Sequence, residues 1–93
     1  MANITGGSVL ELDTVDSIKT TGVTILWIMH YAAADNGIVD ILDAESGLPV
    51  FYYKNIDVSV LGNYKFFPLG GQHAKGLYLN TLTTSNKVWV GLK

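Results

Sequence analysis

The stretch Val23-Thr24-Ile25-Leu26-Trp27-Ile28-Met29-His30-Tyr31-Ala32-Ala33 decides the fold, because it is a β-strand pattern with bulky apolar side chains at both odd and even positions. Successive side chains of a strand point to opposite faces of the sheet, so this strand presents two rows. One row is Val23, Ile25, Trp27, Met29 and Tyr31, and the other is Thr24, Leu26, Ile28, His30 and Ala32. The first row has no small polar member, so we expect it to face the core. Leu26 and Ile28 then need cover from a second surface, since exposing each forgoes roughly 1.5–3 kcal/mol.

Similar short strand patterns fill the rest of the chain, with turn residues between them and no helical periodicity over ten or more residues. We expect further strands at 8–13, 17–19, 38–43, 48–54, 64–69, 77–83 and 87–92. Pro68 has no N–H to donate to a central ladder, which places its strand at a sheet edge or a strand end. The glycine-rich residues 70–76 are expected to form a flexible loop, and residues 55–63 a connection or an edge strand.

Turn residues predict which of these strands pair. Asn36-Gly37 tolerates the positive φ angles of tight hairpins, and Gly47 does the same in the next turn. The expected pairings are a meander of 23–33, 38–43 and 48–54, and a closing hairpin of 77–83 with 87–92. Together these patterns predict one domain over residues 1–93, an antiparallel β-sandwich of about seven or eight strands, with a jelly roll as one arrangement and residues 1–7 as a candidate N-terminal arm.

Composition excludes several classes of protein. Hydrophobic residues make up 48% of the chain and charged residues only 15%, which is far from the signature of disorder. The formal charge is −2 and every basic residue is a lysine, so we expect no nucleic-acid binding. No apolar run approaches the roughly 20 residues of a membrane helix, and the N-terminus lacks the pattern of a secretory signal. We therefore expect synthesis in the cytoplasm and no membrane partner.

No residue pattern indicates catalysis, a cofactor or a metal. His30 and His73 are single histidines without a nearby partner in the sequence, and a structural or solvent role explains each. Asp40, Asp43 and Glu45 precede a glycine turn, but their spacing does not match a calcium-binding loop. A chain without cysteine also has no thiol nucleophile and no disulfide. We expect no catalytic residue, no metal ligand and no cofactor.

Aromatic residues make up 11% of the chain, and they are the one group of residues in the sequence that points to a function. They fit three roles: an ordinary core, a subunit interface, in which aromatic residues are enriched, or a platform on which sugars stack. The residues that we expect at an interface are Leu26, Ile28, Tyr53 and Trp89.

The chain also resembles a group of small bacteriophage virion proteins of the capsid cement or decoration type. The resemblance rests on an N-terminal Met-Ala-Asn, Leu-Asp-Thr at 12–14, Ile-Leu-Trp-Ile at 25–28, Asp-Ala-Glu-Ser-Gly at 43–47 and Gly-Leu-Tyr-Leu-Asn-Thr-Leu-Thr-Thr-Ser-Asn-Lys-Val-Trp-Val-Gly-Leu at 76–92. It implies a β-sandwich without an active site, made in the host cytoplasm. It further implies a homotrimer that binds the major capsid protein on the virion surface.

Two other functions remain open from the residues. One is a glycan- or receptor-binding accessory module of a phage tail, which would use exposed aromatic rings to stack on sugars. The other is a cellular β-sandwich adaptor. The sequence leaves open the strand order, the oligomeric state, the head or tail location and the surface recognised.

Overall fold

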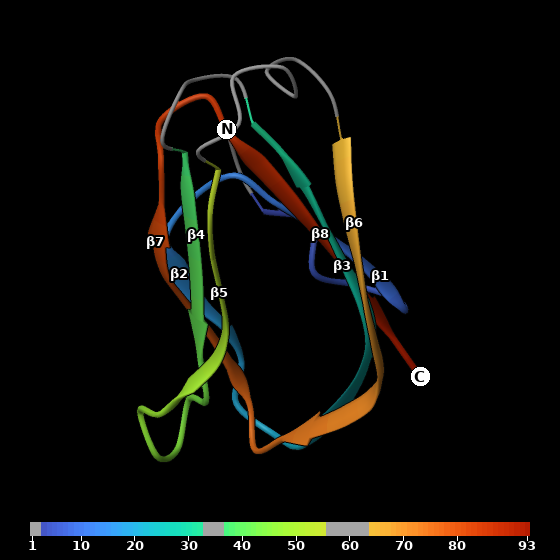
Figure 1. Ribbon diagram of the computed structural model, residues 1–93. Helices are drawn as coiled ribbons and strands as arrows, with labels where there is room; N and C mark the ends of the chain where they lie inside the picture. The colour runs from blue at the N-terminus through green and yellow to red at the C-terminus, as the bar shows by residue number, and fades with distance from the viewer. Residues whose placement is uncertain (1–2, 33–36, 56–63) are drawn as a thin grey trace.

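The computed structural model describes residues 3–32, 37–55 and 64–93, and these form an all-β domain (Figure 1). Its strands are β1 (Val9–Leu12), β2 (Asp16–Lys19), β3 (Val23–Tyr31), β4 (Ile38–Leu42), β5 (Pro49–Lys54), β6 (Tyr64–Ala74), β7 (Leu77–Leu82) and β8 (Lys87–Leu92). The expected antiparallel sandwich of about seven or eight strands is therefore confirmed, with eight strands in the described residues.

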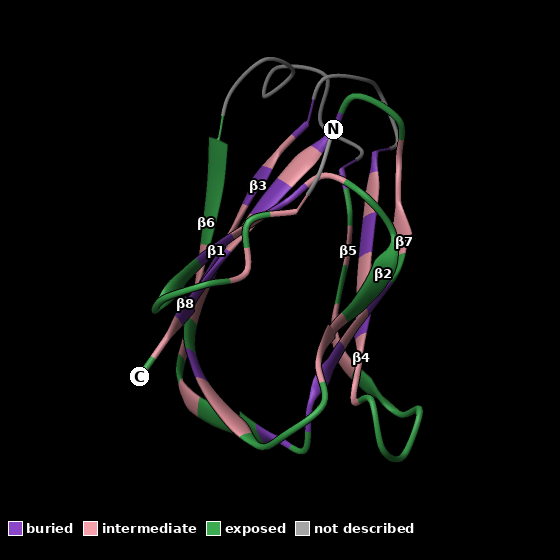
Figure 2. Ribbon diagram, turned by 180° about the vertical axis from the view of Figure 1, so that it is seen from behind, coloured by how far each residue is buried: buried purple, intermediate pink, exposed green. Residues whose placement is uncertain are grey.

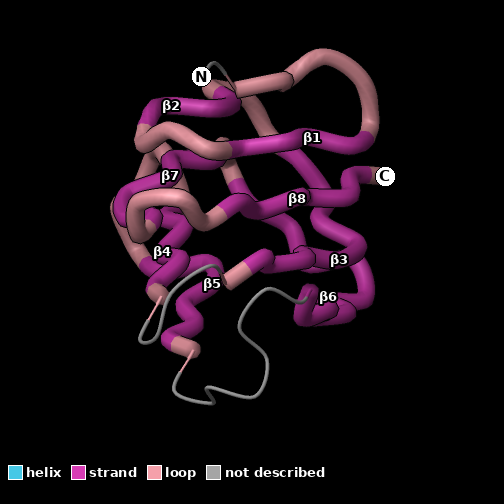
Figure 3. Tube along the Cα trace, turned by 90° about the horizontal axis from the view of Figure 1, so that it is seen from above, coloured by secondary structure: helices cyan, strands magenta, loops and turns pink. Residues whose placement is uncertain are grey.

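The strands form two four-stranded sheets that pack face to face, as Figures 1 and 3 show from two directions. One sheet has the order β1-β8-β3-β6 and the other has the order β2-β7-β4-β5. Strands consecutive in the chain pass from one sheet to the other at every step except β4 to β5. This double-sheet arrangement of eight antiparallel strands is that of a jelly roll.

Of the three expected pairings one is confirmed, since β4 and β5 pair antiparallel across the turn at Gly47, and two are wrong. Strands β7 and β8 do not form a hairpin, and β3 does not join β4 and β5 in a meander, because the jelly roll places β3 and β8 together in the opposite sheet. The turn residues predicted chain reversal correctly, but they do not determine which strand becomes the partner. Leu79 of β7 and Val90 of β8 are both fully buried between the sheets instead. The predicted turn at 34–37 lies outside the described residues except for Gly37.

A β-bulge in β3 exchanges the two predicted rows of side chains. Ile25 pairs with Leu92 of β8 and Trp27 pairs with Gly91, so Leu26 is an extra residue on β3. Ile25 and Ile28 are both buried in the core, whereas Leu26 is 38% exposed. The prediction that Trp27, Met29 and Tyr31 face the core is therefore wrong: beyond the bulge, the row of Ile28, His30 and Ala32 faces inward.

Among the described strands, β6 lies at the edge of its sheet, as Pro68 predicted, and pairs only with β3. The expected loop at 70–76 is wrong, since the strand continues to Ala74. Gly70 and Gly71 have φ angles of 67° and 96°, conformations that glycine adopts without strain, and they lie where the register with β3 shifts. The expected connection or edge strand at 55–63 lies outside the described residues except for Asn55.

Residues 3–7 of the candidate N-terminal arm turn back along β1. The backbone groups of Ile4 and Glu11 exchange two hydrogen bonds of 2.8 and 2.9 Å. The Asn3 side chain also accepts hydrogen bonds from the backbone N–H groups of Asp13 and Thr14, at 2.9 and 3.0 Å.

The core lies between the sheets and is aliphatic in its middle: Leu10, Leu12, Ile25, Ile28, Val39, Ile41, Ala74, Leu77, Leu79, Val88 and Val90 are buried. Beside it, Phe67 of β6 packs against Phe51 and Tyr53 of β5, with ring centroids 5.0 and 4.7 Å apart. Both sheets are thus occupied on their inner faces, so any site must lie on an outer face, an edge or a loop.

Candidate functional site

The outer face of sheet β1-β8-β3-β6 carries a continuous set of apolar and aromatic side chains, here called the aromatic face. It consists of Val9, Leu26, Trp27, Met29, Tyr31, Tyr64, Phe66, Pro68 and Trp89. None of these residues belongs to the core cluster or to the apolar side chains packed against it. The most exposed members are Tyr64 at 61%, Phe66 at 55% and Val9 at 50%. Figure 2 shows this exposure at the start of β6, where the ribbon is green.

Strand register places these side chains in cross-strand rows. Met29 of β3 lies opposite Trp89 of β8 on one side and Phe66 of β6 on the other. In the next row Tyr31 lies opposite Tyr64. Side chains that lie opposite on one face of a sheet are close enough to pack, so the rows form one surface.

Trp27 covers the backbone of β8. It lies opposite Gly91, and a Cβ atom added to Gly91 would meet the indole at 2.1 Å. The same indole contacts Phe66, with ring centroids 5.7 Å apart. A glycine at position 91 therefore allows the largest side chain of β3 to lie flat on the sheet rather than project from it.

A hollow of about 240 Å³ opens at one end of the aromatic face, lined by Tyr31, Tyr64, Lys87 and Trp89. Tyr64 is 5.3 Å from Tyr31 and 5.5 Å from Trp89 between ring centroids, and both pairs of rings are tilted. The Trp89 indole is fixed at its edge, because its Nε1–H donates a 3.0 Å hydrogen bond to Glu11 Oε1. The hollow is thus lined by three aromatic side chains and one lysine.

The outer face of the other sheet is more polar. Asp40 of β4 lies opposite Tyr52 of β5 and Thr81 of β7, and Asn80 Nδ2 donates a 3.1 Å hydrogen bond to Asp40 Oδ2. Tyr52 is 56% exposed on this face and has no aromatic ring contact among the described residues. Among the described residues, the ring contacts on an outer face all lie on the sheet β1-β8-β3-β6.

Two of the four predicted interface residues lie on the aromatic face and two do not. Leu26 and Trp89 belong to it. Ile28 is fully buried at 0% exposure, so it has no surface to offer a partner. Tyr53 faces inward, where its hydroxyl donates a 3.3 Å hydrogen bond to Asn55 Oδ1. The bulge at Leu26 accounts for the error at Ile28, because it turns the even positions of β3 toward the core.

Trp27, Tyr64 and Phe66 are members of the face that the sequence did not single out. One signal pointed to Trp27: an isolated glycine within a strand pattern, here Gly91, marks a bulge or a close approach to the backbone. Tyr64 and Phe66 alternate with Lys65 and Phe67, and their orientation depended on knowing that Phe67 faces the core.

The acidic turn that superficially resembled a calcium loop is a structural turn. Asp43 Oδ1 accepts hydrogen bonds from the backbone N–H groups of Glu45 and Ser46, and its Oδ2 accepts one of 3.0 Å from Lys75. These donors, that of Lys75 first, hold the pKa of Asp43 below its ordinary value. No group of three or more metal-ligating side chains occurs in the part of the chain that the structure describes.

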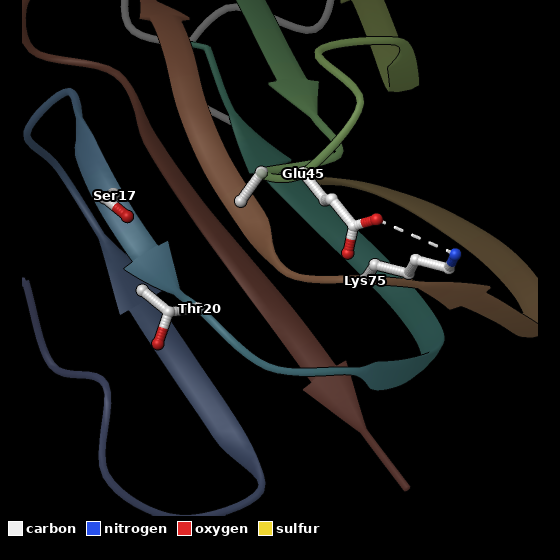
Figure 4. A pocket seen from close by; sticks show the side chains of 5 residues that line it. Ser17, Thr20, Glu45 and Lys75 are labelled. Carbon is white, nitrogen blue, oxygen red and sulfur yellow. Dashed lines mark ion pairs between the residues drawn. The ribbon is translucent and has the colours of Figure 1, made fainter.

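A second hollow, of about 280 Å³, adjoins this turn (Figure 4). It is lined by Ser17, Thr20, Ala44, Glu45 and Lys75, and its ion pair between Glu45 and Lys75 measures 3.8 Å with both side chains about two-thirds exposed. An exposed pair of this kind contributes little and holds no group in a fixed position. The described lining of this hollow therefore offers no fixed charged group to bind a ligand.

The two histidines lie in different environments. His30 is fully buried, and its Nε2 lies 2.8 Å from Asn86 Oδ1. Burial lowers the pKa of His30, and the hydrogen bond to Asn86 opposes that effect only in part. His73 is exposed at the far end of β6, opposite Thr24. The structure does not bring the two together.

Comparisons with known proteins found no matching family model, no matching curated protein and no matching solved structure. Among the described residues, no helix is long and apolar enough to cross a membrane. The functional argument therefore rests on the geometry of the aromatic face.

Proposed function

We propose that this protein is a structural virion protein that binds and stabilises a phage capsid as a cement or decoration protein, without catalysis. The observation that carries the proposal is the aromatic face on one side of the sandwich. The resemblance to virion proteins supplies the biological setting, and the jelly roll supplies a rigid module whose inner faces are already filled.

The size of the aromatic face favours a protein partner. An aromatic side chain that is fully covered removes roughly 150–250 Å² from water, so Tyr64 and Phe66, each more than half exposed, together leave on the order of 200 Å². With their partly exposed neighbours they form one contiguous apolar patch, and the largest apolar patch of a soluble protein is often functional. A contact that buried it would gain about 25 cal/mol for each Å² removed from water.

We assign the aromatic face to self-association, as part of a homotrimer. Interfaces between permanent subunits are more apolar than those between transient partners, and a face of this composition left open would promote aggregation. In a ring of three copies each contact joins two different surfaces, so the aromatic face of one copy packs on another surface of the next. The centre of this contact is the row of Val9, Trp27 and Pro68, with the Phe66 ring against Trp27.

The assembled trimer then binds the major capsid protein. A ligand that binds only the assembled shell stabilises it by about 2.7 kcal/mol at one hundred times its dissociation constant. Decoration therefore raises the free energy needed to separate capsid subunits, and this role needs contact area rather than chemistry.

The experiment is co-sedimentation of the purified protein with capsids that lack it, followed by heating of the complexes. The variant Phe66→Ser removes an exposed ring from the aromatic face, and Tyr52→Ser removes an equally exposed ring from the polar sheet as its matched control. We expect Phe66→Ser to lose capsid binding and Tyr52→Ser to retain it. Equal binding by both variants would refute the assignment of the face.

A second candidate function is a glycan- or receptor-binding accessory module of a phage tail. The hollow between Tyr31, Tyr64 and Trp89 favours it, because aromatic rings with polar edges stack on sugars.

A further inference from the structure

We infer that the hollow lined by Tyr31, Tyr64, Lys87 and Trp89 is a carbohydrate site that takes one pyranose ring, bearing either a neutral hydroxymethyl group or a carboxylate. The inference rests on the second candidate function above and names its ligand. It is compatible with the decoration role when the contact between subunits is centred at the other end of the aromatic face and leaves this end open.

The shape of the hollow limits the size of the ligand. Its volume of about 240 Å³ lies below the roughly 300–1,000 Å³ of pockets that hold drug-sized molecules. Tyr64 stands between Tyr31 and Trp89 at centroid distances of 5.3 and 5.5 Å, with interplanar angles of 48° and 58°. The tilted rings border a small, open hollow, whose size suits a single ring rather than an extended chain.

The residues that line the hollow fit a ligand with one apolar face and polar edges. Aromatic faces carry negative partial charge and attract the C–H bonds on one face of a pyranose ring. Lys87 lines the same hollow and offers three N–H donors to ring hydroxyl groups or to a carboxylate. The hydroxyls of Tyr31 and Tyr64 add groups that both donate and accept. A pyranose has this combination of an apolar face and hydroxylated edges.

Other small ligands fit less well. A quaternary ammonium group would be repelled by the positive charge of Lys87, which lines the same hollow. A nucleobase would stack on the same rings. The phosphate backbone of its nucleic acid would, however, meet a protein of net charge −2 that has no arginine.

Glu11 is a positioning residue for this site. Its carboxylate accepts the Trp89 Nε1–H at 3.0 Å across the β1-β8 pairing, which holds the edge of the indole that lines the hollow. A preorganised ring avoids the entropy cost of ordering it on binding.

Strand register separates the site from the centre of the proposed self-association. Lys87, Tyr31 and Tyr64 form the last paired row of β8-β3-β6, and β1 does not reach that row. The row of Val9, Trp27 and Pro68 lies toward the other end of the sheet, and the row of Phe66, Met29 and Trp89 lies between the two. A trimer centred there leaves the hollow at the rim of the contact.

The test is an NMR titration of the full chain with the methyl glycosides of glucose and galactose and with the methyl glycosides of their uronic acids. The two tryptophans serve as probe and internal control, since Trp89 lines the hollow and Trp27 lies over Gly91. We expect the Trp89 indole N–H signal to shift saturably with at least one sugar while the Trp27 signal stays in place. No saturable shift with any of the four sugars up to tens of millimolar would overturn the inference.

Variants locate the binding. Tyr64→Ala removes the exposed central ring and is expected to weaken binding at least tenfold, whereas Tyr52→Ala on the other sheet leaves it unchanged. Lys87→Met is expected to weaken the binding of a uronic acid more than the binding of the corresponding neutral sugar, because it removes the positive charge. Glu11→Ala is expected to broaden the Trp89 indole signal and weaken binding, and Glu11→Gln, which keeps an acceptor, restores both. Binding that survives Tyr64→Ala would place the sugar elsewhere and overturn the assignment.

The same samples separate this inference from the decoration role. Solution mass and capsid co-sedimentation report on self-association and docking, and the sugar titration reports on the hollow. A protein that trimerises and binds capsids but shows no sugar-dependent shift retains the first proposal and loses this one. A protein that stays monomeric but binds a sugar saturably retains the carbohydrate site and loses the trimer proposal.

Discussion

The Trp27 indole lies directly over Gly91 of the neighbouring strand, in space that a single added methyl group would occupy: a Cβ on Gly91 would come within 2.1 Å of Trp27 Cε2. This contact lays the indole along the aromatic face and against Phe66. It is the joint result of the bulge at Leu26, which turns Trp27 outward, and of the missing side chain at position 91.

Gly91→Ala is expected to displace the Trp27 indole from the sheet. Overpacking of this kind typically costs about 1–3 kcal/mol, and the indole can relieve part of it by swinging toward solvent. Urea unfolding measures the loss, and tryptophan fluorescence shifting to longer wavelength reports the displaced ring. Gly6→Ala is the control, because Gly6 has an ordinary φ and nothing within 4 Å of an added Cβ. Unchanged fluorescence in Gly91→Ala would contradict the packing described.

Gly76→Ala is expected to destabilise the fold more than Gly91→Ala. Gly76 has a φ of 126°, and an added Cβ would meet the Lys19 carbonyl oxygen at 2.7 Å and Ala44 Cβ at 2.8 Å. Here the neighbours include backbone, which has little freedom to move, so strain and overpacking add to about 3 kcal/mol. Chemical denaturation checks this. A loss no greater than that of Gly6→Ala would show that the turn between β6 and β7 is not as tight as described.

Stability is expected to fall as the pH is lowered through the ordinary histidine range, because of His30. Burial lowers the pKa of His30, so the unfolded chain binds a proton at pH values where the folded chain does not. The free energy of unfolding then decreases below about pH 6.5, by at most about 1.4 kcal/mol per pH unit. Its surroundings are the Asn86 side chain, the edge of the Tyr53 ring and, opposite on β6, Lys65.

Urea unfolding at pH values from 7.5 to 5.5 measures this dependence, with His30→Gln as the comparison. The variant lacks the titrating group, so its free energy of unfolding should change less over the interval, although its absolute stability is lower. Identical pH slopes for both proteins would mean that His30 does not carry the effect. Carboxylates such as Asp43 contribute in a lower pH range and are common to both proteins.

Asn86→Ala is expected to cost about 1–3 kcal/mol, because it leaves a buried donor without a partner. The Asn86 amide N–H donates to the Thr84 carbonyl oxygen at 3.3 Å, which orients Oδ1 as the acceptor for the His30 Nε2–H. His30 Nδ1 already has no hydrogen-bond partner among the described residues. Thermal unfolding of the variant measures the loss, and Thr84→Ala, which keeps the backbone carbonyl, serves as control.

The sequence was sufficient for the fold class but not for strand pairing. Alternation of apolar residues and the spacing of turns predict strands, and all eight occur near their expected positions. Pairing in a jelly roll joins strands far apart in the chain, such as β1 with β8 and β3 with β6, and no local turn residue encodes such a choice. The hairpin and the meander were therefore predicted from signals that describe chain reversal alone.

The candidate site was predictable only in part, because one extra residue in β3 changes which side chains face outward. A period of two assigns faces correctly until a bulge inserts an extra residue, after which every later side chain changes face. Leu26 is such a residue, so Ile28 was assigned to the surface and Trp27 to the core. Trp89 was placed correctly because β8 pairs with β1 without interruption and with β3 at a fixed register after the bulge.

The most direct test of the central proposal is the mass of the purified protein in solution at micromolar concentration, measured by sedimentation velocity for the wild type, Phe66→Ser and Tyr52→Ser. The proposal predicts three times the chain mass of 10.1 kDa for the wild type and Tyr52→Ser, and a single chain for Phe66→Ser. A wild-type protein that sediments as one folded chain would contradict the account.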